Sequence, residues 1–204
     1  MGKLIVKTAA VTFSLLVAVA LMLFGIVSLS APAAMMELTD SLGMNGASAY
    51  YSVAVYDRSG DISDLAVAVE KSYDVGHYTD AAEYGQKMLG DDAFAEYCAA
   101  RDEDTEGSSS ILGDYRQYAT GMVASAEYFC GEKDAALDIA FAQLGKNSFP
   151  ANNAFMYLRN AAVQSEDKEF CGKILERCAG ITPQDAQDVK VLQNFLDLLR
   201  ADCA

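Results

Sequence analysis

The run DEDTEGSSSILGD, from position 102 to 114, comes closest to a metal-binding motif in this 204-residue chain. Its acidic side chains and its glycine match positions 1, 3, 5 and 6 of a calcium-binding loop: Asp102, Asp104, Glu106 and Gly107. Position 12 of that template is Gly113 instead of a bidentate Glu, and position 8 is Ser109 instead of an aliphatic residue. The run therefore favours a solvated acidic loop, with calcium binding as the alternative, and we predict no metal ligand.

His77 is the only histidine in the chain. Neither a nucleophile motif nor a second histidine accompanies it, and the Cys and His residues do not have the spacing of a zinc site. We therefore expect His77 to lie at the surface of a turn. The sequence predicts no catalytic residue, no cofactor and no enzyme activity.

The five cysteines form no Cys-x-x-Cys pair: Cys98, Cys130, Cys171, Cys178 and Cys203. Cys171 and Cys178 lie seven residues apart (178 − 171 = 7) on one expected helix, hence about 10.5 Å apart along its axis. A disulfide needs Cα atoms within about 7 Å, so these two cannot pair. Because an odd number of cysteines also argues against a disulfide framework, we expect buried, reduced thiols.

The charge is distributed unevenly along the chain, which has 15 basic and 29 acidic residues. Lys3 and Lys7 are the only charges in the first seven residues, so the rest carries 13 − 29 = −16. An acidic body of that size repels phosphate backbones, which excludes nucleic acid as a partner. It also disfavours a body that lies flat on an anionic membrane surface.

The stretch from Thr8 to Met36 contains no charged residue. A helix needs about 20 apolar residues to cross a bilayer, and this stretch is long enough. Because lysines are retained on the cytoplasmic side, we expect residues 1–7 inside, a transmembrane anchor at 8–36 and an extracytoplasmic domain at 37–204. A cleaved signal peptide is the alternative, with an Ala-x-Ala exit at Ala31 and Ala33, although signal cores are usually about 7–15 residues long.

The composition of the body is typical of an all-α fold, since Ala, Leu, Glu, Asp, Lys, Gln and Met dominate and Trp is absent. We expect helices over 45–57, 62–75, 78–89, 92–101, 111–130, 134–144, 150–163 and 168–178, with a break at 102–110. The last helix, from about 185, has one apolar stripe that would cap the domain: Val189, Leu192, Phe195, Leu196 and Leu199.

Three stretches of seventeen residues have a common pattern: YDVGHYTDAAEYGQKML from Tyr73, YFCGEKDAALDIAFAQL from Tyr128 and AVQSEDKEFCGKILERC from Ala162. Their turn residues are Gly76, Gly131 and Ser165. The last two are 165 − 131 = 34 apart, and the first two are 131 − 76 = 55 apart, an excess of 21 that covers the acidic loop.

A period of 34 residues resembles the tetratricopeptide repeat, over about residues 60–180. Gly at the turn permits a positive φ, and Ala81 and Ala136 five residues later let two helices approach closely. The pattern also includes Tyr73 and Tyr128 before the turn and Leu89 and Leu144 at the end of the second helix. The third copy departs from it at Ser165 and Phe170, and the usual Trp and Gly of the first helix are absent. A generic helical bundle with short glycine turns is the alternative.

The resemblance implies a concave groove lined by the first helix of each pair. The family's groove positions fall on Glu70 and Tyr73 in the first copy, on Tyr118, Ser125 and Tyr128 in the second, and on Asn152 and Arg159 in the third. Tyr, Arg and Asn are side chains that contact peptides well. Packing within the body is the alternative role for many of the eleven tyrosines.

Together these features predict an α-hairpin repeat array, tethered to the cytoplasmic membrane, that holds a protein or peptide partner in its groove. Two other functions stay open. The first is a secreted helical enzyme or small-ligand binder, which would need facing carboxylates in a deep cleft. The second is a structural subunit of a membrane complex.

Overall fold

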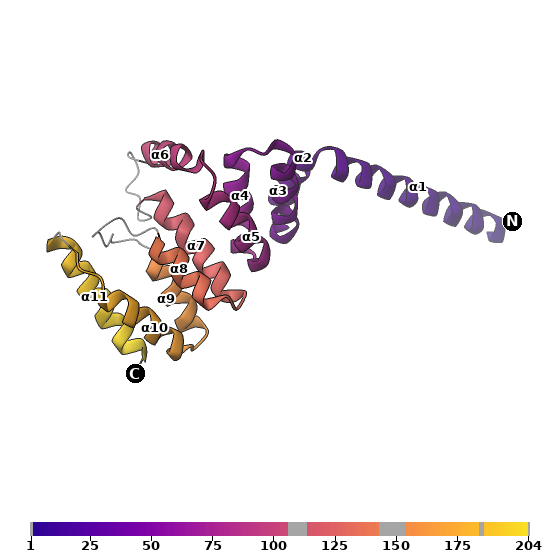
Figure 1. Ribbon diagram of the computed structural model, residues 1–204. Helices are drawn as coiled ribbons and strands as arrows, with labels where there is room; N and C mark the ends of the chain where they lie inside the picture. Colours follow the sequence, from indigo (N-terminus) through magenta and orange to yellow (C-terminus); the bar gives the residue numbers. More distant parts are fainter. Residues whose placement is uncertain (1, 106–113, 143–153, 184–185, 204) are drawn as a thin grey trace.

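The computed structural model describes residues 2–105, 114–142, 154–183 and 186–203 (Figure 1). Over those ranges the chain forms eleven helices and no strand, which confirms the all-α prediction. The helices are α1 (Gly2–Ser30), α2 (Pro32–Ser41), α3 (Asn45–Ser59), α4 (Ile62–Asp74), α5 (Tyr78–Leu89), α6 (Phe94–Thr105), α7 (Tyr115–Phe129), α8 (Lys133–Ala142), α9 (Ala154–Gln164), α10 (Lys168–Ala179) and α11 (Ala186–Cys203).

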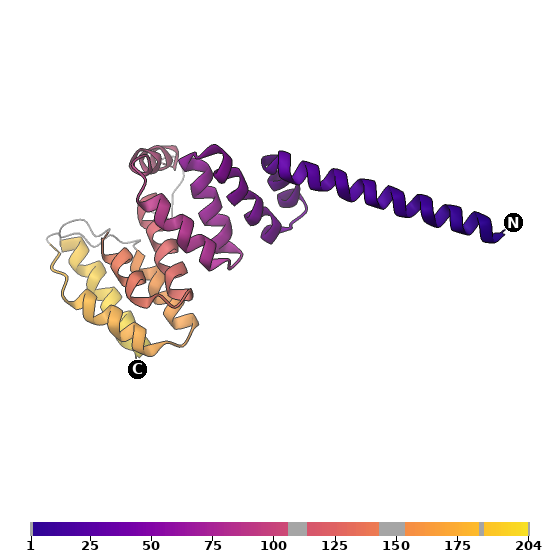
Figure 2. The same cartoon turned by 45° about the vertical axis from the view of Figure 1, so that its right-hand side comes forward.

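Helix α1 projects from the body as a single rod (Figures 1 and 2). Its segment Ala10–Ser30 is long and apolar enough to cross a membrane, and none of it is buried against the body. The apolar helix ends at Ser30, six residues before the predicted limit. Pro32 follows, and a residue before proline is pushed out of the helical region, so Ala31 has φ −138° and a new helix begins.

Four pairs of helices, α2–α3, α4–α5, α7–α8 and α9–α10, are joined by turns of the same geometry. The residue with positive φ in these turns is Gly43, Gly76, Gly131 or Glu166, with φ of 68°, 78°, 91° and 55°. The next backbone N–H donates to the carbonyl five residues back, at 2.8–3.0 Å: Met44 to Thr39, His77 to Ser72, Glu132 to Glu127 and Asp167 to Ala162. This is the Schellman ending of a helix, and it satisfies carbonyls that the helix leaves unpaired.

The third predicted turn is wrong by one residue, because Glu166 and not Ser165 takes the left-handed conformation. The interval from Gly131 is therefore 166 − 131 = 35 residues. The shift also moves the small residue at the helix crossing from Phe170 to Cys171. Counting five residues from each turn gives four small, buried side chains: Ser48, Ala81, Ala136 and Cys171, each exposed by 2% or less.

The pair α2–α3 was not predicted, and its turn at Gly43 precedes Gly76 by 76 − 43 = 33 residues. The long interval between Gly76 and Gly131 contains α6, which interrupts the sequence of pairs, while α5 packs directly on α7. The predicted excess at this place thus contains an inserted helix. The break predicted at 102–110 is wrong in its described part, because residues 102–105 form the end of α6.

Two apolar cores hold the body together. One lies among α4, α5, α6 and α7 and includes Leu65, Val69, Met88, Phe94 and Met122. The other lies among α7, α8, α9, α10 and α11 and includes Phe155, Leu158, Phe170, Ile174 and Leu199. The terminal helix α11 packs on α10 through most of its predicted stripe, but Val189 is 49% exposed.

Candidate partner-binding face

A row of tyrosine rings runs across three helices of the body. Tyr97 from α6, Tyr115 and Tyr118 from α7, and Tyr157 from α9 make successive ring contacts, with centroids 5.5, 5.8 and 5.9 Å apart. We call these four residues the tyrosine row. Tyr115 is buried, whereas the other three are partly exposed. One ring of the row is therefore packed inside the body, and the other three are partly accessible at the surface.

The row depends on a glycine in the middle of α7. A Cβ on Gly121 would lie 2.4 Å from Cδ2 and 2.7 Å from Cγ of Tyr157, which is closer than real Cβ contacts. Only a residue without a side chain lets the ring lie against the helix at this point. Gly121 thus brings α9 close enough to α7 for Tyr157 to reach Tyr118.

Carboxylates lie beside the row. Glu70 on α4 accepts a hydrogen bond from the Tyr115 hydroxyl at 2.7 Å and pairs with Arg101 of α6 at 3.7 Å. The Arg101 guanidinium lies 4.8 Å from the centre of the Tyr115 ring. These contacts join α4, α6 and α7 around one acidic side chain.

Burial raises the pKa of Tyr118, and the negative charge of Glu70 raises it further. Burial likewise raises the pKa of Tyr157, with Tyr73 and Asp74 adding to the effect. Both phenols are therefore protonated at neutral pH and could donate a hydrogen bond to a partner. The arrangement offers aromatic faces, hydroxyl donors and carboxylates, which suits the binding of a polar or basic polypeptide segment.

A second aromatic group lies near the turns that follow α4 and α7. Tyr73 contacts Tyr78, and Tyr78 stacks on Phe129 at 4.3 Å. Beyond these, Tyr128 packs on Phe170 at 4.8 Å and donates a hydrogen bond to Asp167 at 3.0 Å. Asp167 begins α10 and also pairs with Lys133 of α8. These contacts hold neighbouring helix pairs together.

Three of the predicted groove residues lie on the half-buried face near the row: Glu70, Tyr73 and Tyr118. Ser125 is fully buried and Tyr128 is 6% exposed, so neither presents a surface to a partner and both leave the candidate face. Arg159 is paired with Asp202 of α11, with N–O distances of 2.5 and 3.0 Å, and is therefore part of the packing of the terminal helix. Asn152 lies outside the described residues.

Sequence reasoning missed Tyr97, Arg101 and Tyr157. The signal for Tyr157 was Gly121, an isolated glycine inside a helical pattern, which often marks a close approach of two elements. Tyr97 and Arg101 come from α6, which falls in the interruption between the matched stretches, so the resemblance assigned them no position.

The described part of the acidic run, for which calcium binding was the alternative, contributes to packing. Asp102 accepts a hydrogen bond from the backbone N–H of Tyr115 at 2.9 Å, and the run from Glu106 to Gly113 lies outside the described residues. The described residues also form no group of three or more His, Cys, Asp or Glu side chains that could hold a metal ion.

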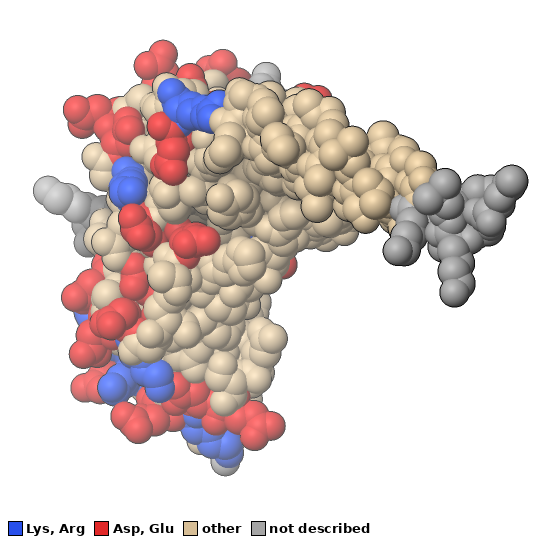
Figure 3. Space-filling view, turned by 90° about the vertical axis from the view of Figure 1, so that its right-hand side faces the viewer, with Lys and Arg blue, Asp and Glu red and all other residues tan. Residues whose placement is uncertain are grey.

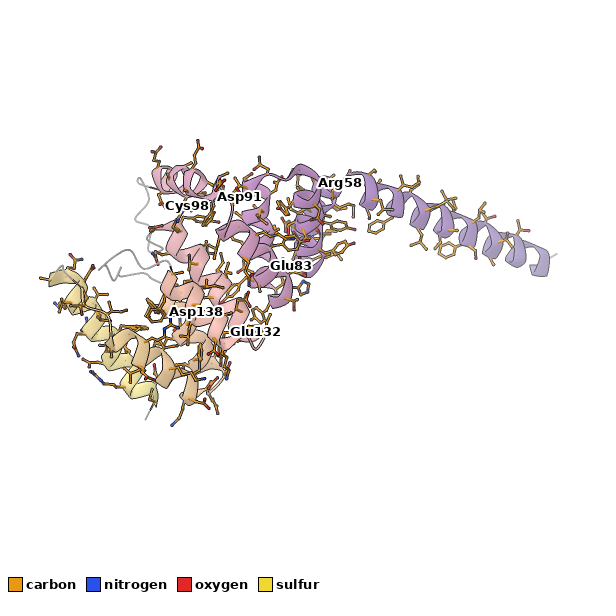
Figure 4. The ribbon with its side chains drawn as sticks, viewed as in Figure 1. Arg58, Glu83, Asp91, Cys98, Glu132 and Asp138 are labelled. Atoms are coloured by element: carbon orange, nitrogen blue, oxygen red, sulfur yellow. The ribbon has the colours of Figure 1, made fainter. Side chains whose placement is uncertain are left out.

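The cysteines are unpaired, and three of them are buried: Cys98, Cys171 and Cys178. Burial raises the pKa of Cys98 to about 11 and that of Cys178 to about 12, so both stay as thiols at neutral pH. Figure 4 labels Cys98 on α6. Cys130, by contrast, is exposed at the end of α7.

A shallow hollow lies between α5 and α8. It is lined by Gln86, Leu89, Gly90, Ala135, Asp138, Ile139 and Ala142. Asp138, labelled in Figure 4, pairs with Arg177 of α10 at 2.8 Å. Among the described residues that line it, Asp138 is the one carboxylate, and most of the others are apolar.

No protein-family model matches the chain, and neither the curated proteins nor the solved structures include a match to it.

Proposed function

We propose that the protein is a membrane-tethered, extracytoplasmic scaffold that binds a polypeptide segment along the tyrosine row. The observation that carries the proposal is the row itself, in which four aromatic side chains from α6, α7 and α9 lie beside Glu70 of α4. Tyrosine and arginine are enriched where proteins bind one another because they bury a large area and keep a polar group.

The proposed architecture is a tetratricopeptide-like array of helix pairs. Its support is the common turn geometry at Gly43, Gly76, Gly131 and Glu166, with a small buried residue five positions later in each case. Stacked helix pairs present an extended surface that serves binding more than catalysis. The helix α6 is an insertion that would extend this surface at one edge.

The chemistry of the row favours a partner segment with basic side chains. A lysine or arginine of the partner would meet aromatic faces, which attract cations, and the exposed carboxylate of Asp74 close by. The net charge of −16 on the body would steer such a segment towards the surface.

The proposed location rests on α1. Its apolar segment is preceded by Lys3 and Lys7 and followed by an acidic body, which favours an inside amino terminus and an outside body. A cleaved signal peptide would export the same body without tethering it.

The test is site-specific photocrosslinking in the full-length protein in its own membrane. A photoreactive phenylalanine analogue at position 118 should give discrete adducts with a polypeptide, and Asp74→Lys in the same chain should weaken them. The control is the same analogue at Leu198, which is 44% exposed on α11 and lies away from the row. Equal adducts at positions 118 and 198, or no adduct at 118, would contradict the proposed binding face.

A further inference from the structure

The end of α1 is held by two side chains of α3. Arg58 donates to the backbone carbonyl of Ser30 at 3.0 Å and also to that of Leu29. Tyr51 donates from its hydroxyl to Oγ of Ser28 at 3.0 Å. The last carbonyls of a helix lack partners within it and carry partial negative charge, so a guanidinium is favourable there. Figure 4 labels Arg58 at the junction of α1 and the body.

The length of the apolar segment sets the height of this junction relative to a bilayer. The 21 residues of Ala10–Ser30 are about 31 Å long as a helix. The hydrocarbon core is about 30 Å thick, and the headgroup layer adds about 5–7 Å on each side. A helix that spans the core therefore ends near Ser30, and α2 begins only two residues later. The pair α2–α3 must then lie at the level of the lipid headgroups.

The exposed apolar side chains of the body are concentrated in this pair. In the described chain beyond α1, the large hydrophobic residues that are exposed include four between positions 38 and 50: Leu38 (47%), Leu42 (63%), Met44 (52%) and Tyr50 (68%). The others, Val163, Val189 and Leu198, are spread over α9 and α11. Apolar side chains gathered on a surface mark an interaction site, whereas scattered ones do not.

The charge on this side of the molecule is also low. Figure 3, with α1 turned towards the viewer, has uncharged surface continuing from α1 over the adjoining face, with a basic patch beside the root of α1 and charged residues, mostly acidic, along the left edge and the bottom. In α2, the carboxylate of Asp40 is held by Lys71 at 2.8 Å, although Glu37 is exposed. Between positions 38 and 50, where the four exposed apolar residues lie, Asp40 is the only charged residue.

We infer that the α2–α3 pair rests on the outer surface of the bilayer, with Leu42, Met44 and Tyr50 inserted at the boundary between headgroups and acyl chains. This inference rests on the proposed anchoring by α1. The contact is apolar, and tyrosine is a residue that favours the interface. It requires no anionic lipid, so it does not conflict with the expectation that the acidic body avoids a negative surface.

The absence of tryptophan from the chain makes the test direct, since one introduced Trp is the only indole. Full-length Leu42→Trp, Tyr50→Trp and Leu198→Trp would be reconstituted into phosphatidylcholine vesicles, with and without bromine on the upper acyl chain. A fourth variant, Leu23→Trp in α1, reports on the anchor. Far-ultraviolet circular dichroism checks that each variant keeps its helical content.

We expect blue-shifted emission and a loss of intensity in brominated vesicles at positions 42 and 50, but not at position 198. If positions 42 and 50 behave like 198 while position 23 is quenched, the surface contact is refuted and the anchoring stands. If position 23 is not quenched either, the anchoring itself is refuted and this inference with it.

Discussion

The ring of Tyr157 on α9 lies against the backbone of Gly121 on α7, so closely that a Cβ at position 121 would be 2.4 Å from the ring. An aromatic ring held between helices cannot move aside cheaply. We therefore expect Gly121→Ala to destabilise the body by about 1–3 kcal/mol, in spite of the better helix propensity of alanine. Urea unfolding followed by circular dichroism measures the change.

Gly172→Ala is the matched control, because Gly172 is also inside a helix and an added Cβ there meets nothing within 4 Å. It should be neutral or stabilising by up to about 1 kcal/mol. If both substitutions have the same effect, the close approach of α7 and α9 is wrong.

The turns provide a second matched pair. Gly131→Ala places a side chain at φ 91° in open space, so only backbone strain acts, and we expect a loss of about 1–2 kcal/mol. Glu166→Gly removes the same kind of strain at φ 55° and should stabilise the body by about 1 kcal/mol. Thermal unfolding of both variants tests this. A destabilising Glu166→Gly would indicate that Ser165 is the turn residue after all.

Substitutions in the ion pair between Arg159 and Asp202 can distinguish a role of Arg159 in the packing of α11 from a role in partner binding. Each side chain is 17% exposed, and removing one partner leaves the other charge poorly solvated. Arg159→Met should therefore cost about 2 kcal/mol of unfolding free energy but leave the crosslink at position 118 intact. The double variant with Asp202→Leu should recover part of the loss. If Arg159→Met has normal stability but loses the crosslink, Arg159 belongs to the binding face.

Asp167 makes the stability of the body depend on pH. Burial alone would raise the pKa of this carboxyl, but hydrogen bonds from Lys133, the Phe170 N–H and Tyr128 outweigh it, and the folded pKa is lowered. A lowered folded pKa stabilises the native state above the unfolded pKa of about 3.9, and this stabilisation is lost as pH falls through the folded value.

Asp167→Asn keeps a side-chain acceptor at the start of α10 but removes the charge. We expect the variant to be less stable than the parent at pH 7 and the difference to shrink as the pH falls below the unfolded pKa of about 3.9. Urea unfolding at a series of pH values measures this. A difference that does not change with pH would exclude the ionic contribution.

The exposed thiol of Cys130 reports on the side of the membrane. Cys98, Cys171 and Cys178 are buried and Cys203 is only partly exposed, so a membrane-impermeant maleimide should label Cys130 most readily, with Cys203 as the second site, in sealed cells whose cytoplasmic membrane is accessible from outside. Cys130→Ser should remove most of the label. Labelling that appears only after the membrane is permeabilised would place the body in the cytosol.

Much of the helical architecture could be predicted because glycine marks turns and apolar residues mark buried faces. Gly76 and Gly131 are the clearest examples, since only glycine enters the left-handed region without strain. Glu166 enters this region at a cost in backbone strain, so a turn at Glu166 was not expected. The sequence pattern therefore placed the turn at the neighbouring Ser165. The pair closed by Gly43 was missed because no tyrosine precedes that turn, so it did not match the other stretches.

The candidate face was harder to predict, because its residues depend on contacts between distant parts of the chain. Ser125 and Tyr128 were assigned by position in a repeat, yet both are buried, and Tyr128 packs on Phe170 of α10. Arg159 is paired with a residue 43 positions later, which only the packing of α11 reveals. Tyr97 and Arg101 belong to an insertion, and a repeat pattern has no information about an insertion.

A single residue, Ala31, connects α1 to the body, and Tyr51 and Arg58 of α3 also bond to the last turn of α1. This connection restricts the position of the body relative to the helix, whereas a long flexible linker would let the two move independently. With the proposed anchoring, the body would stand at a fixed height above the bilayer. A polypeptide partner would then have to approach within a thin layer above the lipid, so proteins embedded in the same membrane would have an advantage over soluble ones.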